Sequence, residues 1–301
     1  MKKEEFFELI RERMEERMED GTEVRLHEVV KNNHVVKHGI MICDKERNIA
    51  PTLYLDEFYE EHEAGRDLGE ILQVISDNLK RGMPRARIDM DFFMTYEKVK
   101  DKICYRLINY EKNEELLREI PHLPFLDLAI CFYYPFWHEE IGKGSILIRN
   151  EHVEKWNVTV KELWKVANEN TRELYPEVCC PMDKLLLEMT RHEEEAWTAL
   201  PEEGWGCVSM KVLTNKQRIF GAAVILYDDY LKQLSDCLQG DFFMIPSSIH
   251  EVLILPAVEG ECETLEKMIC EVNATTVDPQ EVLSDHLYRY ERDKARVCIA
   301  V

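Results

Sequence analysis

The sequence lacks every short motif that would identify a common active site. It contains no GxGxxG and no GxxxxGKS/T segment, so the glycine-rich loops that cradle dinucleotides and phosphates are missing. It also contains no HExxH, no CxxC and no GxSxG, which are typical of zinc proteases, of thioredoxin-like redox sites and of α/β-hydrolases. From these absences we predict no structural or catalytic metal and no cofactor.

Long apolar runs are missing as well. No stretch approaches the roughly 18 consecutive apolar residues that a membrane-spanning helix needs. Residues 1–20 are charged throughout and have no apolar core of the kind found in secretory signals. The ten cysteines are scattered, several of them in apolar stripes, which is typical of free thiols in a reducing compartment. We therefore predict a cytoplasmic protein without a membrane segment.

Positive charge is scarce. The chain has 38 lysines and arginines against 59 aspartates and glutamates, which gives a net charge of −21. A surface of this sign repels the phosphates of nucleic acids and of anionic lipids, so we predict no binding to nucleic acid or membrane. The same charge suits a protein partner with a basic surface, and it also suits simple solubility.

Helical periodicity is clear in the first third of the chain. Residues 3–18 place apolar side chains at helical spacing, and residues 67–80 form a second amphipathic helix with the capping-box pair Asp67 and Glu70. Between them, residues 24–30 and 35–42 have the composition of two strands of a hairpin.

The last third is the most apolar part and predicts the order ββαββα. The predicted strands are 208–212, 220–227, 242–245 and 252–255, and the predicted helices are 229–239 and one from Thr264, with a further helix start at 278–281. Hairpins followed by helices predict an α+β fold, with antiparallel sheets and helices packed on one face. Matching positions of the helices at 159–170 and 264–273 suggest an internal duplication of a ββα-type unit.

One polar cluster interrupts the apolar run at 242–255. Ser247, Ser248, His250 and Glu251 bring hydroxyls, an imidazole and a carboxylate into five residues. They are the candidate catalytic residues of a site at a strand end. The alternative is a tight hairpin turn at Pro246-Ser247-Ser248, because serine hydroxyls commonly bond to the local backbone. A serine–histidine pair also normally comes from distant segments, so we favour the turn.

Several segments together resemble a family of bacterial domains of unknown function that is common in anaerobic Gram-positive gut bacteria. These segments are 106–109, 121–122, 127–129, 213–215, 221–223, 245–252, 271–273 and 283–285. The end of the chain, 207–290, is also distantly similar to another uncharacterised bacterial family. The resemblance implies a cytoplasmic bacterial protein and supplies no reaction. It covers nearly the whole chain, so we expect residues 1–301 to form one family-length unit with subdomains 1–175 and 205–301, joined by an irregular connection at 176–204.

The sequence favours a binding function over an enzymatic one. The leading hypothesis is a soluble cytoplasmic accessory or binding protein, to which the aromatic cluster at 133–138 would contribute a contact surface. One alternative is a hydrolase or transferase with a site around Ser248, His250 and Glu251. The other is an acidic inhibitor or immunity-type protein that docks a basic partner.

Overall fold

The computed structural model describes residues 1–18, 22–44, 47–84, 87–183, 185 and 210–300. These residues form two compact units. Unit 1 comprises Met1–Phe93 and Pro135–Ser145, and unit 2 comprises Met94–Tyr134 and Ile146–Val301. Most of the predicted connection at 176–204 lies outside the described residues, as do residues 208–209 of the strand predicted at 208–212. The described part of that strand is observed from Lys211 onward.

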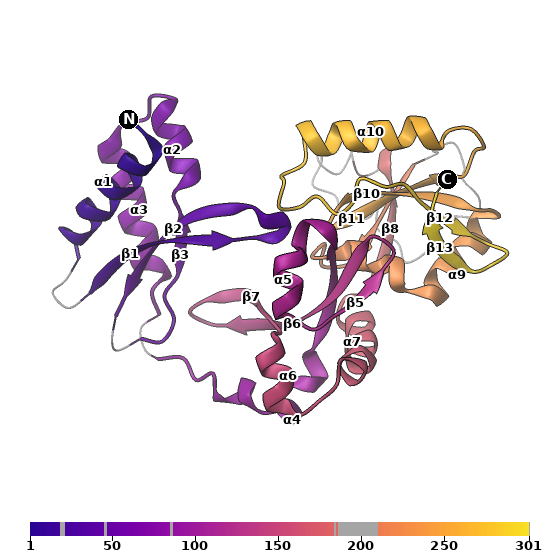
Figure 1. Cartoon of the computed structure of the whole chain (residues 1–301), viewed down its shortest axis with the longest axis horizontal. Coiled ribbons are helices and arrows are strands. Elements are labelled where there is room, and N and C mark those ends of the chain that lie inside the picture. The colour runs from indigo at the N-terminus through magenta and orange to yellow at the C-terminus, as the bar shows by residue number, and fades with distance from the viewer. Residues whose placement is uncertain (19–21, 45–46, 85–86, 184, 186–209, 301) are drawn as a thin grey trace. The chain divides into compact units, whose positions relative to one another are not determined.

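Unit 1 is a three-stranded antiparallel sheet covered by helices (Figure 1). Its elements are α1 (Lys3–Glu15), β1 (Glu23–Val30), η1 (Asn32–His34), β2 (Val36–Cys43), β3 (Thr52–Tyr54), α2 (Asp56–Glu63), α3 (Leu68–Gly82) and η2 (Asp91–Met94). The strand order is β1-β2-β3. Both predicted helices and the predicted hairpin are therefore confirmed.

The core of unit 1 follows from the helical spacing of its apolar residues. Phe6, Phe7, Ile10 and Met14 of α1 are buried against one face of the sheet, together with Ile75 and its neighbours on α3. The Asp67 side chain accepts a hydrogen bond from the Glu70 N–H and so begins α3 as a capping residue. In this unit the helices lie on one face, as predicted.

Unit 2 contains two antiparallel sheets. One has the order β4-β6-β5 with β7 also paired to β6, and the other has the order β13-β12-β10-β11-β9-β8. The connected ends of β6 and β7, within Pro135–Ser145, belong to unit 1. The first part of the unit consists of α4 (Tyr96–Val99), η3 (Lys100–Lys102), β4 (Cys104–Asn109), η4 (Glu111–Asn113), α5 (Glu114–Glu119), β5 (His122–Phe125), β6 (Leu128–His138), β7 (Gly142–Leu147), α6 (Asn150–Trp156) and α7 (Val160–Leu174). The second part consists of β8 (Glu177–Pro181), β9 (Lys211–Asn215), η5 (Gly221–Leu226), α9 (Asp228–Leu238), β10 (Phe242–Ser248), β11 (Glu251–Pro256), α10 (Cys262–Thr275), β12 (Tyr288–Glu291) and β13 (Arg296–Ile299).

Helices cover both faces of the six-stranded sheet (Figure 1). The face with Phe243 and Ile245 packs against Ile269 of α10. On the opposite face Phe242 stacks on Tyr290. Burial raises the pKa of Tyr290, and the negative charges of Asp228 and Asp236 on α9 raise it further, so α9 lies on this side of the sheet. The α+β class with antiparallel sheets is confirmed, and in unit 2 the helices lie on two faces because alternate residues of β10 are apolar on both sides.

Four local predictions are wrong. Residues 221–226 form the buried 3-10 helix η5 instead of a strand, and residues 278–281 form a turn instead of a helix start. The segment predicted to be irregular from 176 begins with strand β8. The turn predicted at 246–248 lies at Ile249-His250, and Pro246, Ser247 and Ser248 belong to β10.

Candidate functional site

The four candidate residues lie at one end of the β10–β11 hairpin. Ser248 pairs with Glu251 across the hairpin, and the register shifts between Ile245 and Ser248. The Ser248 hydroxyl accepts a hydrogen bond from the His250 backbone N–H at 3.0 Å. This is the local bond of a serine turn, and it lies beside the turn at Ile249-His250.

The His250 imidazole is held by the backbone of another segment. Its Nδ1 accepts a hydrogen bond from the Phe220 N–H at 3.1 Å, and the two rings stack with centroids 5.7 Å apart and planes 11° from parallel. A nitrogen that accepts a hydrogen bond carries no proton, so the neutral ring is protonated on Nε2. That nitrogen lies 3.7 Å from the Glu281 carboxylate.

Phe220 reaches this position through an unusual backbone conformation. Its φ is +52°, in the left-handed region, immediately before η5. The next residue, Gly221, lies so close to the hairpin that a Cβ atom there would be 2.4 Å from the His250 carbonyl oxygen. The Thr214 hydroxyl donates a 2.7 Å hydrogen bond to the same oxygen. Only glycine allows η5 to approach the hairpin this closely.

The Phe220 ring also joins this hairpin to the four-stranded sheet of unit 2. The Arg106 guanidinium of β4 lies 4.8 Å from the centre of the ring, a cation–π contact. The ring of Tyr133 on β6 meets it edge to face at 5.2 Å. These contacts are typical of a packed junction between sheets.

Glu251 is half-buried beside the histidine. Burial raises the pKa of its carboxyl above the ordinary value, although His250, Arg218 and a hydrogen bond from the Ser247 hydroxyl act in the opposite direction. Burial therefore disfavours the ionised form of this carboxyl relative to that of an exposed glutamate.

Within the part of the chain that the structure describes, no hydrogen bond joins the Ser247 or Ser248 hydroxyl to the His250 ring. Nucleophilic catalysis requires such a contact between hydroxyl and base. The four predicted residues therefore lie close together. The contacts observed for Ser248 and His250 are with backbone groups and with the Glu281 carboxylate, and no serine hydroxyl contacts the His250 ring among the described residues. What remains accessible is the Nε2–H group of His250 with the Glu281 carboxylate beside it.

No sequence motif predicts a second polar network, which lies in unit 2. The Asp127 carboxylate accepts hydrogen bonds from the Ser284 hydroxyl at 2.6 Å and the Tyr288 hydroxyl at 2.7 Å. Nearby, Asn273 of α10 donates to the Ser284 carbonyl and to Asp285. The segments 127–129, 271–273 and 283–285 are among those that carry the family resemblance, and this is the one sequence feature that points to the network. The network ties the two sheets together.

The aromatic cluster at 133–138 divides between core and surface. Tyr133 and Tyr134 are buried, whereas the Trp137 side chain is 67% exposed. Phe136 stacks on Phe92 with centroids 6.4 Å apart. One large aromatic side chain of the predicted contact surface is therefore open to solvent.

The described residues contain neither a metal-binding cluster nor a membrane-spanning helix. No group of three or more histidine, cysteine, aspartate and glutamate side chains among them has the arrangement of a metal site. Among the same residues, no helix has both the length and the apolar character needed to cross a membrane.

Comparison with known proteins gives a family and no activity. No curated protein and no solved structure matches the chain. A family model matches residues 3–292, which is nearly the whole chain. The chain therefore belongs to DUF5688, a family of unknown function.

Proposed function

We propose that the chain is an accessory binding protein that docks a protein partner with a basic surface through the acidic end of unit 2. In this proposal the protein is cytoplasmic and bacterial, as its resemblance to gut bacterial sequences implies, and the His250 hairpin supports the fold. The binding surface is formed by α10 and the loops that flank it, which we call the α10 surface, residues 258–281.

Charge is the first support for the proposal. From Glu251 to Asp285 the only basic side chain is Lys267. The acidic side chains of the same stretch are Glu251, Glu259, Glu261, Glu263, Glu266, Glu271, Asp278, Glu281 and Asp285. A field of one sign over such a surface speeds encounter with a partner of opposite charge and disfavours other partners.

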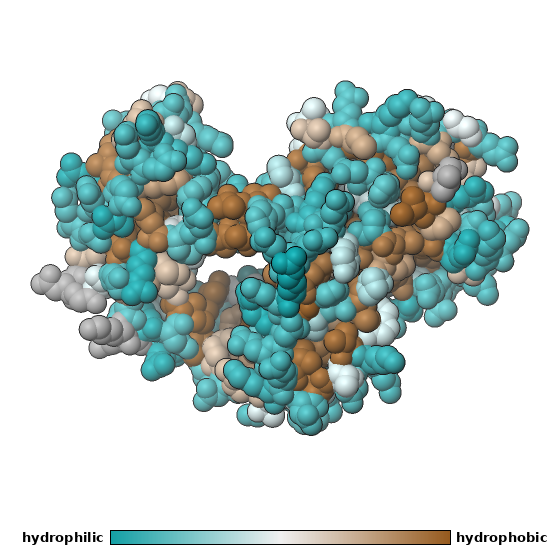
Figure 2. Space-filling view, in the orientation of Figure 1, coloured by the Kyte–Doolittle hydropathy of each residue, from teal (hydrophilic) through white to brown (hydrophobic). Residues whose placement is uncertain are grey.

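Exposed apolar side chains on the same helix are the observation that carries the proposal. Ile269 is the only residue of α10 that is fully buried. Met268 is 40% exposed and Val272 is 43% exposed, and they are four residues apart on one side of the helix. Val258, before the helix, is 48% exposed. Figure 2 shows hydrophilic side chains over much of the visible surface at α10, with apolar side chains between them.

Apolar contacts surrounded by charge are the usual composition of a protein interface. The apolar centre supplies affinity, methionine adapts to a partner's shape, and the charged rim supplies specificity and a fast association rate. Simple solubility would explain the carboxylates but gives no reason for exposed Met268 and Val272 among them.

Co-purification with tagged variants tests the proposal. Glu259 and Glu271 are exposed and form no ion pair with any described residue, so the double variant E259K/E271K reverses charge at the α10 surface without breaking a contact. The matched control, E57K/E60K on α2, makes the same change in net charge at exposed positions of unit 1.

The proposal expects a stoichiometric protein partner with a basic surface. Wild-type protein and E57K/E60K should retain it at low ionic strength, high salt should release it, and E259K/E271K should not retain it. Retention of the same partner by E259K/E271K, or retention that is insensitive to salt, would refute the role of the α10 surface.

A further inference from the structure

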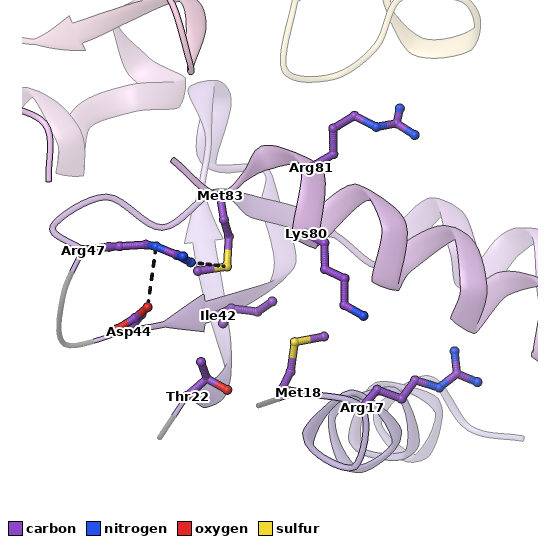
Figure 3. A pocket seen from close by; sticks show the side chains of 9 residues that line it. All are labelled: Arg17, Met18, Thr22, Ile42, Asp44, Arg47, Lys80, Arg81 and Met83. Atoms are coloured by element: carbon purple, nitrogen blue, oxygen red, sulfur yellow. Dashed lines mark hydrogen bonds and ion pairs between the residues drawn. The ribbon is translucent and has the colours of Figure 1, made fainter. Parts of the chain in front are cut away.

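Unit 1 contains a cavity of about 660 Å³, and the described residues that line it are mainly basic, whereas the chain is acidic (Figure 3). It lies where the C-terminal ends of α1 and α3 approach the start of β1 and the end of β2. Its lining residues are Arg17, Met18, Thr22, Ile42, Asp44, Arg47, Lys80, Arg81 and Met83. Four of these are cationic and one is acidic, although acidic residues outnumber basic ones in the chain as a whole.

Two of the four cations, Arg17 and Lys80, have no partner in the part of the chain that the structure describes. Asp44 lies 3.6 Å from the guanidinium of Arg47, which also contacts the sulfur of Met83. Among the described residues, Arg17 and Lys80 have no side-chain hydrogen bond or ion pair. Figure 3 shows the Arg17 and Lys80 side chains on the same side of the cavity, next to Met18, whereas Arg81 points away.

Helix ends explain only part of this arrangement. Cations near the C-terminus of a helix are stabilised by the helix dipole, and Lys80 and Arg17 lie at or just after such ends. The dipole does not account for Arg47, which follows a strand, or for the convergence of cations from three segments on one cavity.

Apolar side chains line the rest of the cavity. Met18, Ile42 and Met83 line it, and Ile42 is 1% exposed. Methionine side chains are flexible and polarizable, so they adjust to aromatic and aliphatic groups. A cavity lined by both apolar and cationic side chains fits a ligand that has an apolar body and an anionic group.

We propose that unit 1 binds a small organic phosphate monoester. The phosphate contacts Arg17 and Lys80, whose two charges match a phosphate dianion, and the organic group lies against Met18, Ile42 and Met83. Arg47 is held in place by Asp44 at the edge of the cavity. This site is independent of the proposed protein-binding surface in unit 2.

Isothermal titration calorimetry of the full chain with 1-naphthyl phosphate tests the proposal. Inorganic phosphate and 1-naphthol serve as the anionic and the apolar half of the same ligand. Both halves should bind at least about tenfold more weakly than the whole, since each makes only one set of contacts. Equal binding by either half would overturn the proposal.

Matched variants locate the binding. R17Q and K80Q should each weaken 1-naphthyl phosphate binding about tenfold. R13Q removes the same charge from an exposed arginine of α1 that pairs with Glu16 outside the cavity, and should leave binding unchanged. Thermal unfolding shows whether each variant is folded. If one of R17Q and K80Q does not fold, the other is sufficient for the test. Absence of binding by wild-type protein, or equal binding by all variants, would refute the site.

Discussion

The backbone nitrogen of Phe220 lies 3.1 Å from Nδ1 of His250, and this contact fixes what the histidine can do. A catalytic histidine is usually oriented by a hydrogen bond from its Nδ1–H to a carboxylate. In His250, Nδ1 accepts a hydrogen bond from the Phe220 N–H, so it carries no proton to donate to a carboxylate. The stacked rings and the close approach of Gly221 make the imidazole a part of the packing between η5 and the hairpin.

A structural role for His250 predicts a specific pattern of stability. H250A should cost about 1–2 kcal/mol of unfolding free energy, because the Phe220 N–H loses its acceptor. H250N should recover part of this cost, since its amide oxygen lies near the position of Nδ1. Urea unfolding measures both, and neither variant should change retention of a protein partner. An H250A protein with wild-type stability and no partner binding would show instead that His250 belongs to a working site.

Asp127 should be more important to stability than its position in a turn suggests. It accepts hydrogen bonds from two fully buried residues, Ser284 and Tyr288. Asparagine has one oxygen and so loses one of these acceptors, and D127N should cost about 1–3 kcal/mol. Chemical denaturation compares it with D293N, an exposed aspartate in the β12–β13 turn. A D127N protein as stable as D293N would show that the network contributes little.

Asp56 should make unit 1 sensitive to acid. Burial raises the pKa of this carboxyl, but hydrogen bonds from Lys3 and His38 outweigh burial and lower the pKa to about 2. A pKa below the ordinary value means that the ionised carboxylate stabilises the folded state above about pH 4, and that this stabilisation is lost as the pH falls toward 2.

The corresponding variant is D56N. At pH 7 it should lower the unfolding free energy by roughly 2–3 kcal/mol, because it removes a charge-assisted contact with Lys3 at 2.9 Å. The difference from wild type should shrink as the pH approaches 2. The control D77N, at an exposed position of α3, should have little effect at either pH. A destabilisation by D56N that is constant between pH 7 and 2 would contradict the assigned pKa.

Cysteine reactivity should follow burial. Burial raises the pKa of the Cys104 and Cys179 thiols to about 12, so both remain protonated at neutral pH. Cys270 on α10 is exposed. Iodoacetamide at neutral pH, followed by peptide mass spectrometry, should modify Cys270 in the folded protein and reach Cys104 and Cys179 only after unfolding. Equal labelling of all three in the folded protein would contradict the packing described.

Periodicity predicted the amphipathic elements well, because burial of one face determines them. The helix predicted at 67–80 is observed as α3, and the N-terminal helix as α1. The run from Phe220 to Tyr227 was misassigned as a strand because a short, continuous apolar segment has no period. Its conformation depends on the close approach of Gly221 to Thr214 and to His250, which lie outside the segment on other elements.

The candidate site shows the same division. The polar cluster at 247–251 is visible in the sequence, and the bond between Ser248 and the His250 backbone is a local one. The contacts of the His250 ring with Phe220 and Glu281, by contrast, depend on the tertiary fold. Asp127 and Ser284 are 157 positions apart, so no local pattern predicts their hydrogen bond.

The central claim is that the acidic α10 surface binds a basic partner. The most direct test is the affinity for a fluorescent amphipathic helical peptide with lysines on one face and leucines on the other, measured by anisotropy at low and high ionic strength. We predict that E259K/E271K binds about tenfold more weakly than the control E57K/E60K at low ionic strength, and that salt removes most of the difference. Equal affinity of the two variants at low ionic strength would contradict the claim.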